Sequence, residues 1–377
     1  MRKLAESVHS RYLEKLNIKN DFPEDGYQGA YITDIAENLK NDFSEDLVDK
    51  SNLDNIKDYA EQKIFKEIKS TLKKIQIQFD NFFNEKDLYD NKSIFNIIES
   101  LRKDGLVYDK EGAAWLKATA LGLNQDRVLV KSTGEPTYRL PDMAYHEDKF
   151  KRNYDLIIDV FGADHLDAYP DVIAVCKHLG YNTKKIKVLV HQFVTIQENG
   201  KPVKMSTRKA NFISLDDLIN EVGADVVKYF FSMRGINSHL NFDLNLAKDQ
   251  SEQNPIFYIQ YAHARAINII KKAKDAKLYS SNNINLSQLS ELEELKLIKC
   301  LLKFPELVIK SSEELEPQLI ATYLMETASN FHHYYAKHKV ISDNKDLSTA
   351  RTLLVDATRQ VLFNGLTILG LSAPNKM

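Results

Sequence analysis

The chain is poor in cysteine and tryptophan and has no long apolar run. Its two cysteines, Cys176 and Cys300, lie far apart, and neither has a cysteine or histidine at a spacing that suits metal binding. This pattern argues against a disulfide framework and predicts a reduced, cytoplasmic protein without a tightly bound metal or prosthetic group. No apolar segment approaches the roughly 20 residues of a membrane-spanning helix, and no signal peptide is recognisable, so no membrane partner is expected.

The charge of the chain is nearly balanced. Its formal net charge is −2, so bulk electrostatics does not identify a nucleic-acid binder. Residues 254–377 contain 15 Lys and Arg against 12 Asp and Glu, a surplus of +3 that leaves −5 for the remainder. With 377 residues, 43% of them hydrophobic, the chain is long enough for two or three domains.

Apolar spacing predicts helices in the first part of the chain. It indicates helices over residues 1–20 and 31–39, and peripheral helices rather than disorder over the acidic, lysine-rich residues 41–104. Two short strands, 127–131 and 137–140, are separated by a glycine- and proline-containing turn, which predicts a hairpin.

A strand, a helix and a second strand follow, at 155–161, about 169–179, and 187–196. This order predicts a crossover unit in a buried parallel sheet. Ligands of such sheets bind outside the carboxyl ends of the strands. Residues 162–165, which include Gly162, Asp164 and His165, would therefore share one rim with residues 204–208. Asp164 also suits a helix cap, and His191 in the second strand also suits a hydrogen-bonded core histidine.

From Pro255 onward the spacing is helical, with later segments at 295–310, 317–340 and 347–365. The predicted fold class is therefore α/β. It consists of a partial, nucleotide-binding parallel sheet with inserted helices, followed by an all-α helix bundle. We place the domain boundary between residues 250 and 251.

Residues 204–208, Lys-Met-Ser-Thr-Arg, form a compact cationic segment. An ammonium and a guanidinium flank two hydroxyls, which suits a polyphosphate whose charge grows as pyrophosphate leaves. Just beyond it, Ser214 and Asp217 make an S-x-x-D capping box that predicts the start of a helix. Taken alone, such a basic segment is more often a surface turn.

Tyr138 and Asp142 lie four residues apart, across a predicted strand end and a turn at Pro141. A carboxylate beside a phenol can hold a cation, and a guanidinium fits best because it binds bidentately. The alternative is a core tyrosine followed by a helix-capping aspartate.

Tyr258, Tyr261 and Arg265 have helical spacings of three and four, so they share one helix face. Two aromatic rings and a guanidinium can form a platform for nucleic-acid bases. The alternative is a half-buried aromatic stripe that packs against a neighbouring helix.

In order and spacing, several motifs resemble arginyl-tRNA synthetases of the bacterial type. Those of the catalytic region are YRLPDMAYH at 138–146, FGADH at 161–165 and KMSTR at 204–208; YAHAR at 261–265 and the terminal SAPNKM resemble the anticodon-binding domain. The resemblance implies a class I aminoacyl-tRNA synthetase with a Rossmann-like sheet and a helical anticodon-binding domain. Enzymes of that family form arginyl-adenylate from L-arginine and ATP, with Mg²⁺, and transfer the arginyl group to the 3′ end of tRNA(Arg).

The resemblance also implies residue roles. Tyr138, Asp142 and Asp164 would bind arginine, and Lys204, Ser206 and Arg208 would stabilise the triphosphate during catalysis. The residues implied in ATP binding are Gly162, His165, His191, Lys204 and Met205. The residues implied in anticodon binding are Tyr258, Tyr261, Arg265 and Met377. The second lysine of the usual class I phosphate loop is replaced here by Arg208, which follows Thr207.

The sequence contains no His-x-Gly-His element, the other half of a class I ATP site. We therefore expect the chain to be an N-terminally truncated part of a monomeric parent enzyme, without adenylate-forming activity of its own. The main alternative is a non-catalytic, tRNA-binding paralogue. Another class I synthetase, such as the cysteine enzyme, is disfavoured by the absence of zinc ligands and by the Tyr138/Asp142 pair.

A pyrophosphate-exchange assay tests this expectation. A longer parent that contains His-x-Gly-His should exchange pyrophosphate into ATP only with arginine and tRNA present, whereas the 377-residue chain alone should not. Exchange supported by a different amino acid, or full exchange by the chain alone, would contradict it.

Overall fold

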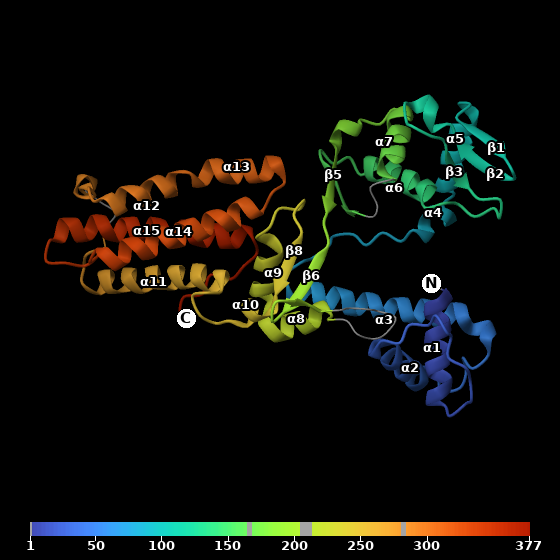
Figure 1. Cartoon of the computed structure of the whole chain (residues 1–377), viewed down its shortest axis with the longest axis horizontal. Coiled ribbons are helices and arrows are strands. Elements are labelled where there is room, and N and C mark those ends of the chain that lie inside the picture. The colour runs from blue at the N-terminus through green and yellow to red at the C-terminus, as the bar shows by residue number, and fades with distance from the viewer. Residues whose placement is uncertain (1, 164–167, 204–212, 280–283) are drawn as a thin grey trace. The chain divides into compact units, whose positions relative to one another are not determined.

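The structure, a computed structural model, describes residues 2–163, 168–203, 213–279 and 284–377 (Figure 1). Its residues pack into two compact units. The first comprises Met1–Gln78, Val194–Gly235 and Leu240–Met377, and the second comprises Phe79–Phe193 and Ile236–His239. Among the described helices, none combines the length and apolar character that crossing a membrane requires.

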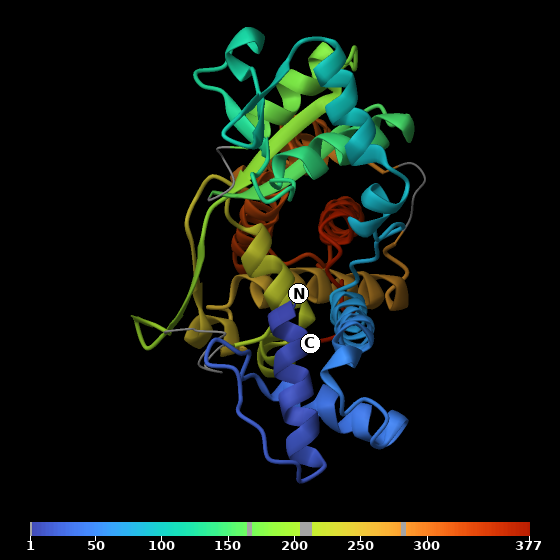
Figure 2. The ribbon, with the colours of Figure 1, turned by 90° about the vertical axis from the view of Figure 1, so that its right-hand side faces the viewer.

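The first unit begins with three helices, drawn in blue in Figures 1 and 2: α1 (Arg2–Lys15), α2 (Ala30–Phe43) and α3 (Leu53–Lys74). Apolar side chains at helical spacing, among them Val8, Ile32 and Ile56, form a small core between them. Tyr12 is fully buried there, and its hydroxyl donates to the carbonyl oxygen of Ser44 at 2.7 Å. The helices predicted at the start of the chain are thus present.

The second unit begins with two helices and an antiparallel sheet of order β1-β2-β3: α4 (Lys86–Asp90), α5 (Ser93–Lys103), β1 (Val107–Lys110), β2 (Ala113–Leu116) and β3 (Arg127–Val130). It continues with α6 (Arg139–Lys151), β4 (Ile157–Gly162), α7 (Tyr169–His178) and β5 (Ile186–His191). Strands β4 and β5 pair in parallel through the crossover helix α7, as the spacing predicts.

The predicted hairpin at 127–140 is wrong in its second strand. β3 pairs instead with β2, and the chain after the turn makes only a single bridge, between Val130 and Pro136. The turn itself forms, with Gly134 at φ +85°. Residues from Arg139 onward are helical, because Pro141 is tolerated in a first helical turn, where its missing N–H has no partner to lose.

The predicted strand at 187–196 is two strands in two different sheets. β5 ends at His191, Phe193 is 65% exposed, and β6 (Val194–Glu198) begins a sheet of the first unit. That sheet has the order β7-β6-β8, with β7 (Lys201–Pro202) antiparallel and β8 (Leu240–Asp243) parallel to β6. A continuous apolar run does not reveal such a division, because each half is buried against different neighbours.

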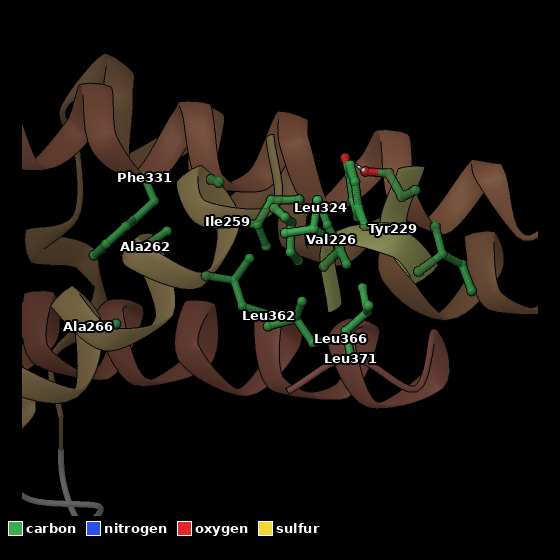
Figure 3. Packing of buried hydrophobic residues seen from close by; sticks show 14 of the residues in the cluster. Val226, Tyr229, Ile259, Ala262, Ala266, Leu324, Phe331, Leu362, Leu366 and Leu371 are labelled. Atoms are coloured by element: carbon green, nitrogen blue, oxygen red, sulfur yellow. Dashed lines mark hydrogen bonds between the residues drawn. The ribbon is translucent and has the colours of Figure 1, made fainter. Parts of the chain in front are cut away.

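The first unit also contains the following helices: α8 (Leu215–Val222), α9 (Ala224–Ser232), α10 (Leu244–Lys248), α11 (Pro255–Asp275), α12 (Leu292–Leu302), α13 (Phe304–Glu314), α14 (Gln318–Lys337) and α15 (Lys345–Ile368). The predicted helix at 295–310 is divided at Lys303, where Pro305 opens α13. One core joins α9, α11, α14 and α15, with Val226, Ile259, Leu324 and Leu362 in contact (Figure 3). The α/β region followed by a helix bundle agrees with the predicted fold class.

Gly365 permits the close approach of α15 to α14. A Cβ atom at this position would lie 2.5 Å from a Leu324 methyl carbon, and Leu324 is fully buried. Gly365→Ala should therefore lower the free energy of unfolding by about 1–3 kcal/mol, despite the helix propensity of alanine. Thr367→Ala, on the exposed side of the same helix, should change it by less than about 0.5 kcal/mol. A Gly365→Ala variant as stable as the parent in urea unfolding would contradict this packing.

Candidate substrate and RNA sites

Tyr138 and Asp142 lie on the first turn of α6. Tyr138 is 57% exposed, and its carbonyl oxygen accepts the Asp142 N–H at 3.3 Å. Arg139 anchors this turn, because its Nε donates at 2.7 Å to the buried Asp171 of α7. The alternative interpretation, a core tyrosine at a strand end with a helix-capping aspartate, is therefore wrong.

Asp142 borders a small hollow of about 250 Å³. The hollow is also lined by Phe83, Glu85 and Tyr145, and the Phe83 and Tyr145 rings stack with centroids 4.4 Å apart. Two carboxylates beside aromatic rings favour a cation, and a planar guanidinium can use both kinds of partner.

A buried polar relay holds α6 against β4. The His146 ring lies 2.8 Å from the carbonyl oxygen of Asp142 and 2.8 Å from an Asp159 carboxylate oxygen, and Lys149 also donates to Asp159. Burial alone would raise the pKa of the Asp159 carboxyl, but the bonds from His146 and Lys149 outweigh it and hold that pKa below its ordinary value. Neither His146 nor Asp159 was predicted as a site residue; the acidic Asp159 in the middle of an apolar strand was the available signal.

The carboxyl ends of β4 and β5 bring Gly162 and His191 together, since they are register partners. His191 is exposed, so its interpretation as a core histidine is wrong. Asp164 and His165, predicted for the same rim, lie outside the described residues.

The cationic segment with Lys204, Met205, Ser206 and Arg208 also lies outside the described residues. The helix after it begins as predicted. Ser214 Oγ accepts the Asp217 N–H at 3.1 Å, and the Asp217 carboxylate accepts the Ser214 N–H at 2.8 Å.

Helix α3 contacts the start of α8. The Asp216 carboxylate accepts hydrogen bonds from Lys74 and Thr71 of α3, and these two bonds lower the pKa of Asp216. A hollow of about 620 Å³ lies between these elements and Tyr31 of α2. This contact was not predicted from the sequence, because more than one hundred residues separate its partners.

The three residues predicted to share a face of α11 do so. Arg265 Nη2 donates to the Tyr261 hydroxyl at 2.9 Å, and the guanidinium lies 4.4 Å from the Tyr261 ring centroid and 5.2 Å from that of Tyr335 on α14. The Tyr258 ring packs on His332 of α14, with centroids 4.6 Å apart. The stripe thus packs against a neighbouring helix, and Tyr335 remains exposed beside Arg265.

His332 orients Arg265 and was missed by the sequence analysis. Arg265 Nη1 donates to His332 Nδ1 at 2.7 Å, and His332 Nε2 donates to the Tyr258 carbonyl oxygen at 3.3 Å. This arrangement requires the neutral imidazole with its proton on Nε2. Burial lowers the pKa of His332, and the positive charge of Arg265 adds to this effect. The adjacent pair His332-His333 in an apolar helix was the only sequence signal.

Met377, the last residue, is 54% exposed. The tail before it is attached to α11, since His263 Nδ1 donates to the Pro374 carbonyl oxygen at 3.1 Å. Tyr258, Tyr261 and Arg265 belong to the same helix.

Residues 17–229 match the family model of the class I (R) tRNA synthetase catalytic domain, and residues 259–377 match the DALR anticodon binding domain. These two matches define a class I aminoacyl-tRNA synthetase with a helical anticodon-binding domain. The chain is 49% identical over 379 residues to an arginine–tRNA ligase of Desulfotalea psychrophila, and 43% identical over 393 residues to that of Salinibacter ruber. These alignments cover the whole chain, and 69% and 70% of the relatives. The chain belongs to the arginyl-tRNA synthetase family.

Solved structures have the same fold. An arginyl-tRNA synthetase structure from Campylobacter jejuni matches with a TM-score of 0.89 at 28% identity, covering the whole chain and 82% of that structure. The Thermus thermophilus enzyme matches with a TM-score of 0.74 at 20% identity, covering 98% of the chain and 74% of that structure.

His332→Phe should keep the ring packing but remove the acceptor of Arg265. We expect it to lower the free energy of unfolding by about 1–3 kcal/mol, while His333→Phe, at an exposed neighbour, should change it by less than about 0.5 kcal/mol. Urea unfolding of both variants at pH 7.5 checks this.

The pH dependence carries a second signature. The pKa of His332 is lower in the folded chain than its ordinary value of 6.5. The contribution of the neutral ring to the free energy of unfolding is therefore present above pH 6.5 and is lost as the pH falls below that value. The unsubstituted 377-residue chain should therefore lose more stability between pH 7.5 and pH 5 than the His332→Phe variant. Equal losses would contradict a neutral, half-buried His332.

Proposed function

We propose that this chain serves ATP-dependent attachment of L-arginine to tRNA(Arg), and that Asp142 recognises the arginine guanidinium. The observation that carries the proposal is the position of Asp142. It lies on an anchored helical turn beside a hollow whose other polar lining includes Glu85 and Tyr145. A carboxylate held in place can bind a guanidinium through two charge-assisted hydrogen bonds. Tyr138, exposed on the same turn, adds a phenol, and Asp164 is the third residue proposed for arginine.

The proposed ATP site combines two parts of the chain. Gly162 and His191, at the carboxyl ends of neighbouring parallel strands, favour nucleotide binding at that rim, together with His165. Lys204, Ser206 and Arg208, with Met205, would bind the triphosphate and stabilise the charge that develops as pyrophosphate leaves. Mg²⁺ would enter with ATP and neutralise part of that charge.

The proposed RNA site is the cluster on α11. Tyr258, Tyr261 and Arg265, with Met377, would contact the anticodon loop, where unstacked bases can pack on aromatic rings and guanidinium planes. In this proposal residues 1–250, with the helices of 41–104 inserted, belong to the catalytic region, and residues 251–377 form the anticodon-binding domain. The two family matches lie on either side of that boundary.

The relatives do not favour the alternative of a non-catalytic paralogue, since both are arginine–tRNA ligases. We further propose that the protein is monomeric and works in the cytoplasm. The free, buried thiols of Cys176 and Cys300 agree with a reducing compartment, and burial raises the pKa of Cys176 to about 12, which makes its thiolate rare.

Asp142→Asn tests the guanidinium site in a longer parent that contains both halves of the ATP site. We expect arginine binding to weaken by about 1–3 kcal/mol, the value of a lost charge-assisted pair, with the KM for ATP changed much less. Arginine-dependent pyrophosphate exchange in the presence of tRNA measures both constants.

Glu147→Gln is the matched control. Glu147 lies on the same helix, and its carboxylate accepts from the Tyr181 hydroxyl at 2.8 Å rather than lining the hollow. An unchanged arginine KM in Asp142→Asn, or an equal effect of Glu147→Gln, would remove Asp142 from the proposed site.

A further inference from the structure

The C-terminal tail is bound to helix α9, which lies within the residues that match the catalytic domain model. Asp225 lies on α9, inside the residues 17–229 that match the catalytic domain model. Its carboxylate accepts the Ser372 N–H at 3.2 Å and the Ser372 hydroxyl, and it also accepts Gln260 Nε2 of α11 at 2.8 Å. Gln260 in turn donates to the Ser372 carbonyl oxygen at 3.0 Å. One carboxylate therefore joins α9, α11 and the tail.

A second contact beside it fixes the start of the tail. Lys228, one turn after Asp225 on α9, donates to the carbonyl oxygen of Gly370 at 2.6 Å. Gly370 has φ +63°, and a Cβ atom there would lie 2.4 Å from Lys228 Nζ, so only glycine fits without moving the lysine. Burial lowers the pKa of Lys228, and the neighbouring Asp225 opposes this shift.

These contacts restrict where the last residue can lie. The tail is held at Gly370, at Ser372, and at Pro374 through His263 of α11. Met377 lies three residues after Pro374, so it stays within about 11 Å of that anchor, given at most about 3.6 Å per extended residue. His263 lies between Tyr261 and Arg265 in the α11 sequence. Residues two apart on a helix face away from each other, so the anchors hold Met377 near the same turn of α11 as the proposed RNA site, on the side of the helix that carries His263.

We propose that Asp225 is a positioning residue for tRNA recognition: by clamping Ser372 between α9 and α11, it holds Met377 where it contacts the anticodon loop together with Tyr261 and Arg265. The proposal rests on the proposed function of the α11 cluster. In this proposal the Asp225 carboxylate, which lies within the residues that match the catalytic domain model, contributes to anticodon recognition. An unanchored tail would have to be ordered on each binding event, which weakens binding by the entropy of that ordering.

Asp225→Asn is the principal variant. Asparagine has nearly the same shape, but its amide presents N–H donors to Ser372 and Gln260, which are themselves donors at this site. Ser372→Ala is the second variant, since it removes one donor and leaves the Asp225 charge and its bond to Gln260. Asp243→Asn is the matched control: Asp243 accepts the N–H groups of Asn245 and Leu246 at the start of α10, and neither donor belongs to the tail.

The measurement is direct binding of the 377-residue chain to a tRNA(Arg) transcript and to the same transcript with a substituted anticodon. Asp225→Asn should reduce the preference for the native anticodon by about three- to tenfold, the range expected for the loss of one or two hydrogen bonds, and Ser372→Ala should reduce it less. Asp243→Asn should leave it unchanged. Circular dichroism before each titration establishes that the variants are folded.

A double-variant cycle separates positioning from general stability. Met377→Ala should reduce the preference by itself, and adding Asp225→Asn should reduce it little further, because both changes remove the same contact. Fully additive effects, or an Asp225→Asn variant with the native preference, would overturn the proposal, and Ser372→Ala decides the case if Asp225→Asn does not fold. If neither Arg265→Ala nor Met377→Ala alters the preference, the RNA site itself is wrong and the proposal falls with it.

Discussion

Apolar packing of α11 against α14 and α15 determines the arrangement of the C-terminal half. Ile259, Ala262 and Ala266 are fully buried, and the small alanines let the neighbouring helices approach closely. Because the buried face fixes the rotation of α11 about its axis, it also fixes the directions in which the other side chains leave the helix. Tyr261 and Arg265 then lie toward α14, while Gln260 and His263 hold the C-terminal tail. A single helix therefore couples the core, the proposed RNA site and the chain terminus.

Polar contacts add a precision that apolar packing does not supply. The buried Asp159, with His146 and Lys149, attaches α6 to β4, and the half-buried Asp225 attaches the exposed Ser372 of the tail to α9. Polar groups are costly to bury unless their hydrogen bonds are made, so the Asp159 network tolerates few alternative geometries. Apolar surfaces can slide or rotate over one another at little cost, whereas a carboxylate between two donors cannot. The two sets of contacts occur where the proposed function needs fixed directions, next to Asp142 and in the tail that carries Met377.

Local signals in the sequence were sufficient for most helices and for the parallel pair. The capping box at Ser214, the proline and glycine punctuation, and the stripe of Tyr258, Tyr261 and Arg265 all depend on residues a few positions apart, and the structure contains each of them. The two wrong strand predictions have a common cause. Strand pairing is decided by partners distant in sequence: β3 prefers β2 to the segment after Pro136, and β6 leaves β5 to pair with β8. Apolar alternation detects extended chain but not its neighbour.

The residues of the candidate sites divide in the same way. Asp142, Gly162 and the α11 stripe could be found because each belongs to a short motif or ends a recognisable strand. His332 and Asp225 could not, since their partners lie 67 and 147 residues away. In the proposed sites, short motifs contain the groups that would touch substrate, whereas the groups that position them are distributed over the fold. The proposed reaction brings one end of a tRNA to an adenylate while its anticodon is read elsewhere, so both the substrate site and the RNA site need residues that fix the orientation of the contacting groups. A displacement of about one ångström lowers the rate or the affinity even when every contacting residue is present. Residues like His332 and Asp225 are accordingly where substitutions far from any substrate should have functional effects, and only three-dimensional contacts reveal them.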